Sequence, residues 1–182
     1  MRLLVRIILA LFALCLLLTP QPSTAQQNDV AALEIITLIN GWRLDQGVWP
    51  LRENPVLTDM AVDQAQYVLS LPSIPAGGAI HVGISGESPQ TRALLPQYDW
   101  PPYGDARYVA IGEIAYVGFS ASVALTYWGN SPVHRSTALS PAYREIGVAA
   151  LPHRLGYLYI VVFGSRPNVL PAIADLNTRT LY

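Results

Sequence analysis

Two histidines and one glutamate are the residues of this chain best suited to chemistry. His81 lies in GGAIHVGISGESPQTRAL, Glu113 in AIGEIAYVG and His134 in WGNSPVHRSTALSPAYREIG, each among apolar or small residues. Ionisable groups in such surroundings need partners. If the three side chains meet, they could bind a divalent cation such as zinc, or form a hydrogen-bonded cluster that fixes three segments to one another. Their spacing does not decide between these alternatives, because the histidines lie 53 residues apart and lack the i, i+4 geometry of an HExxH motif.

Ser131 raises nucleophilic catalysis as another reading. It precedes His134 by three residues, and Glu113 could orient the imidazole, which would give a serine–histidine–acid arrangement. Ser131-Pro132 is also an ordinary helix start, and the sequence has neither a GxSxG nucleophile elbow nor an obvious oxyanion hole beside it. We therefore assign no catalytic residue, and the sequence leans away from an enzyme.

The other ionisable groups of this region favour surface roles. His153 falls in the turn between two strand-like runs, where we expect it to be solvent exposed. Arg135 is expected to be a solvated charge beside the histidine, and Arg144 could form a modest surface pair with Glu145 at a strand start.

Aromatic residues are dense in the middle of the chain. Such a density near the histidines could wall a groove for an apolar or carbohydrate ligand, and the residues concerned are Tyr98, Trp100, Tyr103, Tyr108, Tyr127 and Trp128. Core packing is the simpler explanation, above all for Trp42 and Trp128, which fall on predicted helix faces.

The first 25 residues have the pattern of a secretory signal peptide. Arg2 and Arg6 precede an apolar run over 7–18, and Ser23-Thr24-Ala25 offers the small residues of a cleavage site. The run is shorter than the roughly 20 residues of a membrane span, so we expect no membrane span after cleavage. Residues 26–182 then form one secreted domain, of a size that can hold a core by packing alone, because the only cysteine is Cys15.

Composition excludes several classes of function. The chain has 11 basic residues against 12 acidic ones, so it offers no strongly basic face for nucleic acid. All of the basic residues are arginines, and the absence of lysine excludes both a Schiff-base lysine and a phosphate-loop lysine.

Periodicity predicts helices followed by a small sheet. Asp29 can cap a first helix that stops at Gly47, and a second helix starts at Thr58 or Asp59 and ends before Pro72. Further elements are a short helix at Ser88-Pro89, a loop over 96–107, a helix over 120–128, and strands over 108–116, 145–151 and 156–164. Segregated helices and an antiparallel sheet indicate the α+β class.

Taken in order, these segments resemble the CAP superfamily, also called SCP domains, and especially its bacterial secreted branch. The resemblance extends to about Pro171 and is carried by LEIITLINGWRLDQGVWPL, NPVLTDMAVDQAQYV, IHVGISGESPQTRAL, GEIAY, WGNSPVHRSTALSPAYREIGVAA and YLYIVVFG. Each motif is weak alone, but six in the family's order are specific. The resemblance implies a three-layer α-β-α sandwich with an antiparallel central sheet.

The resemblance also implies a cleft. His81 looks like the family's first cavity histidine, His134 like the second, and Glu113 like the glutamate of its Gly-Glu-Asn segment, with Ser131, Trp128 and Arg135 in support. In some members this cleft binds a divalent cation. The chain departs from the pattern at Ile114, Ser131 and Val133, where the family often has asparagine, glutamate and glycine. The implied function is a secreted, non-enzymatic module that binds an extracellular ligand; the alternatives are a metal-assisted hydrolase and a lipid or sterol carrier.

Overall fold

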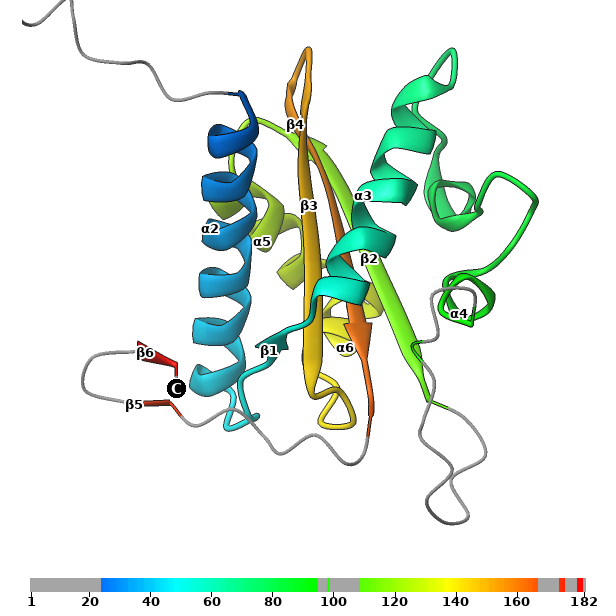
Figure 1. Ribbon diagram of the computed structural model, residues 1–182. Coiled ribbons are helices and arrows are strands. Elements are labelled where there is room, and N and C mark those ends of the chain that lie inside the picture. The colour runs from blue at the N-terminus through cyan, green and yellow to red at the C-terminus, as the bar shows by residue number, and fades with distance from the viewer. Residues whose placement is uncertain (1–23, 95–97, 99–108, 167–173, 176–179, 182) are drawn as a thin grey trace, which may run out of the picture.

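The computed structural model describes residues 24–94, 98, 109–166, 174–175 and 180–181 (Figure 1). Most of the predicted signal peptide and of the C-terminal tail lies outside the described residues, as do Trp100, Tyr103 and Tyr108 of the aromatic region. Within the described part, no helix is both long and apolar enough to cross a membrane.

The first two helices begin earlier than the sequence pattern predicted. Helix α2 spans Thr24–Asp45 and runs through Asp29, because no proline or glycine interrupts the residues before it. Helix α3 spans Pro55–Ser70 and is capped by Asn54, whose Oδ1 accepts hydrogen bonds from the N–H groups of Val56 (2.9 Å) and Leu57 (3.3 Å). Pro55 takes the first helical position, where no N–H is needed, so this cap is stronger than the expected one at Thr58 or Asp59.

The later elements include the predicted ones in the predicted order, together with a 3-10 helix and two short C-terminal strands that the sequence did not predict. They are η1 (Gly77–His81), α4 (Pro89–Arg92), β2 (Ile111–Gly118), α5 (Ala121–Asn130), α6 (Pro132–Ala138), β3 (Glu145–His153), β4 (Gly156–Gly164), β5 (Ala174–Asp175) and β6 (Thr180–Leu181). Ser88 and Ser120 cap α4 and α5 through their hydroxyls, and Pro132 begins α6. His153 was expected to be exposed in a turn, but it is half-buried at the end of β3, where it pairs with Gly156 and its Nδ1 accepts from Leu155 N–H.

The main sheet has the strand order β1-β3-β4-β2, where β1 is Arg52–Glu53. The three longer strands are antiparallel as predicted, with β4 in the middle. The short β1 pairs with β3 in parallel and adds an edge strand to the predicted antiparallel sheet. The segment between the tryptophan-proline pair and the helix cap is too short to give a periodic signal, so the sequence did not predict this strand.

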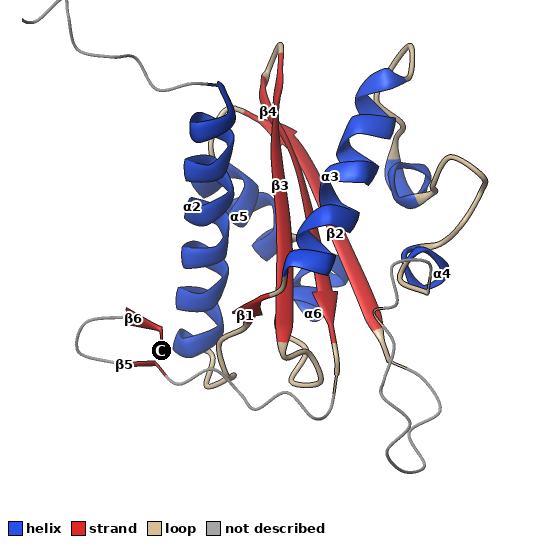
Figure 2. Cartoon of the chain, viewed as in Figure 1, coloured by secondary structure: helices blue, strands red, loops and turns tan. Residues whose placement is uncertain are grey.

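Helices cover both faces of the sheet, which confirms the predicted three-layer α+β arrangement (Figure 2). Along β4, alternate side chains enter two separate cores: Tyr159, Val161 and Phe163 pack with α2 and α5, while Leu158, Ile160 and Val162 pack with α3. A central strand buried on both faces needs a continuous apolar run, and YLYIVVF supplies one.

Glu145 is a buried carboxylate that ties distant segments together. It accepts hydrogen bonds from Asn54 Nδ2 (2.7 Å), Tyr98 Oη (2.5 Å), and Arg166 Nε (2.7 Å) and Nη2 (2.6 Å). Burial acts to raise its pKa, but the hydrogen bonds from Arg166, Tyr98 and Asn54 outweigh burial and lower the pKa below its ordinary 4.5. The expected surface pair with Arg144 is wrong, because Glu145 is only 4% exposed and Arg166 is its partner.

Arg43 plays a similar part between α2 and α6. It is fully buried, and its guanidinium donates to three carbonyl oxygens, those of Trp49 (2.8 Å), Ala138 (2.6 Å) and Ser140 (3.1 Å). Burial, with a smaller effect from Arg144, lowers its pKa to about 10, so Arg43 stays charged at neutral pH. The carbonyls at the end of α6 carry the negative end of the helix dipole and compensate the charge.

Glu145→Gln should destabilise the protein at pH 7 by roughly 2 kcal/mol, because Arg166 loses its buried partner. A lowered folded-state pKa stabilises the fold above the unfolded value of 4.5, and this stabilisation is lost as the pH falls through the folded value. The difference between wild type and variant should therefore shrink below about pH 4.5. Urea unfolding at pH 7 and pH 3 measures it, with the exposed Glu53→Gln as control. An equal difference at both pH values contradicts the assignment.

Candidate functional site

Two of the predicted site residues meet in a hydrogen bond. His81, the last residue of η1, lies with Nδ1 2.8 Å from Oε1 of Glu113, the third residue of β2. The side chain of Glu113 is 1% exposed and that of His81 is 23% exposed. Because an ionised carboxylate only accepts hydrogen bonds, the Nδ1–H of His81 donates to Glu113.

Arg92, which the sequence analysis did not single out, completes this arrangement. It is the last residue of α4, and its Nη2 forms an ion pair with Oε2 of Glu113. Its Nη1 donates to the main-chain carbonyl of His81 at 2.8 Å. We call Glu113, His81 and Arg92 the Glu113 cluster. A buried carboxylate needs a positively charged partner, and in a chain without lysine that partner is an arginine. This requirement is the sequence signal that could have identified Arg92.

Two glutamines hold the segments that carry the Glu113 cluster. Gln64, a buried residue of α3, donates from Nε2 to the carbonyls of Ile80 (2.8 Å) and Val82 (3.1 Å), on either side of His81. Gln90 donates to Val109 O (2.6 Å) and accepts from Ile111 N–H (2.9 Å), which fixes the start of β2. Both amides satisfy main-chain groups that periodicity does not reveal.

His134 approaches β2 from the other face of the sheet. It is the third residue of α6, and its ring packs on Tyr127 with centroids 5.4 Å apart, while Tyr127 packs on Tyr116 at 4.9 Å. Burial, and then the charge of the neighbouring His81, lowers the pKa of His134. Its Nδ1 is buried and has no hydrogen-bond partner among the described residues. His134 is therefore near His81 but does not bind Glu113.

The three supporting residues serve other parts of the structure. Trp128 is fully buried and donates from Nε1 to Ala115 O at 3.1 Å, so it packs in the core. Arg135 is exposed and turns toward α2, where it lies over Trp42 and donates to Gln46 Oε1 at 2.9 Å. Ser131 is the half-buried residue between α5 and α6, and the structure gives its hydroxyl no hydrogen bond to His134.

As arranged, the three predicted ligands do not fit a divalent cation. Among the described residues no group of three or more His, Cys, Asp or Glu side chains could hold a metal ion. Glu113 gives one oxygen to His81 and the other to Arg92, and a guanidinium next to the carboxylate opposes a second cation.

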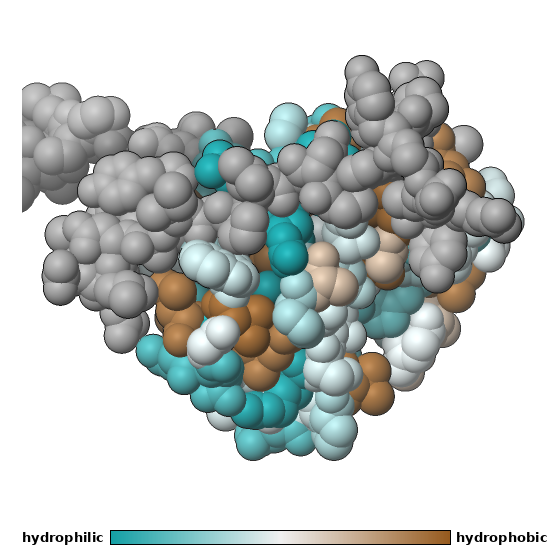
Figure 3. Space-filling model, turned by 90° about the horizontal axis from the view of Figure 1, so that it is seen from below, coloured by the Kyte–Doolittle hydropathy of each residue, from teal (hydrophilic) through white to brown (hydrophobic). Residues whose placement is uncertain are grey.

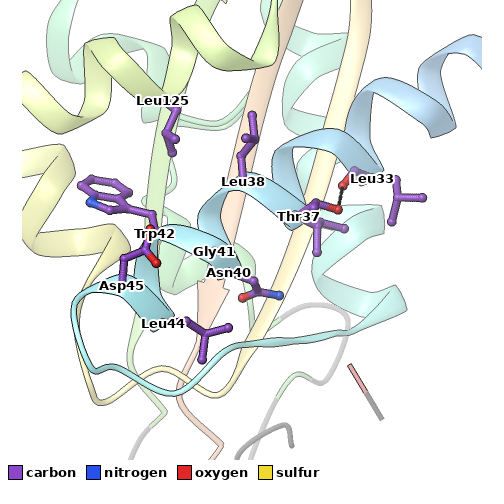
Figure 4. Close-up of a pocket in the computed structure, with 10 residues that line it drawn as sticks. Leu33, Thr37, Leu38, Asn40, Gly41, Trp42, Leu44, Asp45 and Leu125 are labelled. Atoms are coloured by element: carbon purple, nitrogen blue, oxygen red, sulfur yellow. Dashed lines mark hydrogen bonds between the residues drawn. The ribbon is translucent and has the colours of Figure 1, made fainter. Parts of the chain in front are cut away.

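An apolar pocket lies elsewhere, along α2. Its volume is about 460 Å³, and its lining includes Leu33, Leu38, Trp42, Leu44 and Leu125 (Figure 4). Thr37, at its edge, donates its hydroxyl to Leu33 O within the helix. Seen from below, hydrophobic residues gather on the side of the molecule where α2 lies in Figure 1 (Figure 3).

Comparison with protein families gives one match: the model described as the Cysteine-rich secretory protein family, CAP, matches residues 36–164. The comparison with curated proteins gave no match. Cys15, the only cysteine, precedes the matched region.

Three solved structures share the fold. A cysteine-rich secretory protein from Staphylococcus aureus is 18% identical with a TM-score of 0.59, over 81% of this chain and 42% of that one. An outer surface protein from Borrelia burgdorferi is 20% identical with a TM-score of 0.60, over 72% of this chain and 90% of that one. An extracellular SCP-domain protein from Bacillus anthracis is 17% identical with a TM-score of 0.63, over 81% of this chain and 45% of that one. This chain thus spans less than half of the staphylococcal and Bacillus chains.

The family model covers more than half of the chain and the three-layer fold agrees with these structures, so this chain belongs to the CAP family.

Proposed function

We propose that this CAP domain is a secreted, non-enzymatic module that binds an extracellular ligand. The predicted signal peptide supports export, and two of the similar structures are described as extracellular or outer surface proteins. The proposal includes no nucleic-acid partner, since the charge of the chain is nearly balanced.

The partners of Glu113 carry this proposal. A serine–histidine–acid mechanism requires the carboxylate to orient the histidine that activates the serine. Here Glu113 orients His81, whereas Ser131 lies beside His134 in the sequence. The histidine that Glu113 orients is therefore not the one that follows Ser131 in the sequence. Both oxygens of Glu113 bind groups of its own chain, so this glutamate holds η1 and α4 to β2.

If Glu113 has this structural role, substitution of the two histidines should lower the stability of the fold by different amounts. His81→Ala removes a hydrogen bond from a buried carboxylate and should lower stability by about 1–3 kcal/mol. His134→Ala removes ring packing on Tyr127, and the Nδ1 of His134 has no hydrogen-bond partner among the described residues, so its cost should be smaller. Thermal unfolding of both variants measures the order.

Turnover assays test the same proposal from the side of activity. The secreted protein should hydrolyse peptide and ester substrates no faster than buffer, and neither histidine substitution should change that rate. A measurable turnover that His81→Ala or His134→Ala abolishes would overturn the non-enzymatic assignment. Activity that a chelator removes would instead support the metal-assisted hydrolase, the alternative that the present arrangement of Glu113 disfavours.

A lipid carrier is the second candidate, and the pocket along α2 favours it. The pocket offers leucines and a tryptophan at the surface, with only a few polar groups, as ligand sites for apolar molecules do. Its exposed residue Leu33 is 59% accessible and can be changed without disturbing the core.

Leu33→Asp should weaken binding of a fluorescent fatty acid about tenfold, because a buried leucine contact contributes roughly 1.5 kcal/mol or more. Val133→Asp is the matched control, since Val133 is 72% exposed on α6 and does not line the pocket. Fluorescence titration of both variants measures the effect. Equal affinities would place any lipid away from α2, and the absence of binding by wild type would remove this candidate.

A further inference from the structure

Glu113 is compensated by a cation that belongs to the chain. Its carboxylate is 1% exposed, and an isolated charge so far from water is strongly unfavourable. The compensating charge is the guanidinium of Arg92, a side chain that is itself only 11% exposed. The positive charge that stabilises Glu113 is therefore part of the chain, and no ion from solution is needed.

Arg92 also holds the histidine. Nη2 pairs with Glu113, while Nη1 donates to His81 O at 2.8 Å, so one planar group bridges the carboxylate and the main chain of its other partner. The fork geometry of arginine permits this double contact, which a point-like ammonium or a metal ion does not reproduce. Arg92 reaches the cluster because α4 is fixed at Ser88 by its cap and at Gln90 by hydrogen bonds to β2.

The same contacts obstruct a divalent cation. A metal on Glu113 would have to displace Arg92 from Oε2 or the Nδ1–H of His81 from Oε1, and it would lie beside a fixed positive charge. His134 could contribute Nδ1, which has no partner among the described residues, but both oxygens of Glu113 are already engaged by His81 and Arg92. The ligand types of a zinc site are therefore present, with their charge already neutralised.

We propose that Arg92 is the resident cation of the Glu113 cluster: it takes the place of a divalent ion on Glu113, makes the cluster independent of metal, and conceals a latent metal site. The proposal goes beyond ligand binding by the domain, since it concerns what keeps Glu113 buried. The outcomes of the turnover and lipid assays do not decide it.

Zinc titration of the secreted protein and of Arg92 variants tests the proposal. Arg92→Met keeps an apolar stem and removes the charge, Arg92→Gln keeps a hydrogen-bond donor without the charge, and Arg92→Lys keeps the charge without the fork. We expect the zinc affinity of Arg92→Met and Arg92→Gln to exceed that of wild type by a factor of about 100 or more, and that of Arg92→Lys to stay near wild type. Calorimetry measures affinity and stoichiometry.

Two control variants show where the additional zinc ion binds. Adding His81→Ala to Arg92→Gln should abolish the gain, and Arg135→Gln, which removes an exposed arginine of α6, should produce none. Zinc should also raise the melting temperature of Arg92→Gln, because an ion that binds only the folded state stabilises it. That shift should be absent in wild type.

The wild-type protein provides a readout that does not depend on the variants folding. Nitrogen chemical shifts of the His81 and His134 rings should not change when excess zinc is added. Stoichiometric zinc binding by wild type that shifts either ring would overturn the proposal. It would equally be overturned by folded Arg92→Met and Arg92→Gln variants whose zinc affinity stays at the wild-type value.

Discussion

The removal of the Glu113 carboxylate from water is the constraint on which the candidate site depends. A carboxylate at 1% exposure needs a positive charge and hydrogen bonds to both oxygens. These come from η1 and α4, two short elements with little core of their own. The positions of η1 and α4 depend on their contacts with Glu113 as much as on packing. The third residue of an eight-residue strand thus fixes η1 and α4, two elements that precede it in the chain.

The same physical solution recurs at two other places. Glu145 joins the start of α3, Tyr98 and Arg166 through one buried carboxylate, and Arg43 joins α2 to the end of α6 through carbonyl oxygens. In each case one charged side chain satisfies several groups from distant segments, so the helical layers are fixed to the sheet by polar contacts as well as by burial. A family description that includes cysteine-rich proteins suggests disulfides, yet this chain has none available in the matched region. Charge pairing and close packing hold the described part of the fold together.

Sequence reasoning recovered the elements whose signals are local. The α4 cap at Ser88, the stop at Gly47 and the apolar β3–β4 hairpin are encoded in neighbouring residues, and the structure agrees with them. The parallel strand β1 and the true starts of α2 and α3 were missed, because a two-residue strand has no period and a better cap at Asn54 overrides a good one. The three-layer arrangement followed from resemblance to the CAP family and not from periodicity.

For the site, residue types were easier to predict than pairings. His81 and Glu113 were expected to lie together and do so, but nothing in their spacing could show that Arg92 would bind the second oxygen or that His134 would pack on tyrosines across the sheet. Pairing depends on which face of β2 each element covers: the side chain of Glu113 shares its face with Ala115, toward α3, while Tyr116 faces α5. Alternation along the strand therefore separates Glu113 from the residue beneath His134. A single-residue change of register on β2 would exchange these neighbours, so the strand register determines which side chains can reach Glu113.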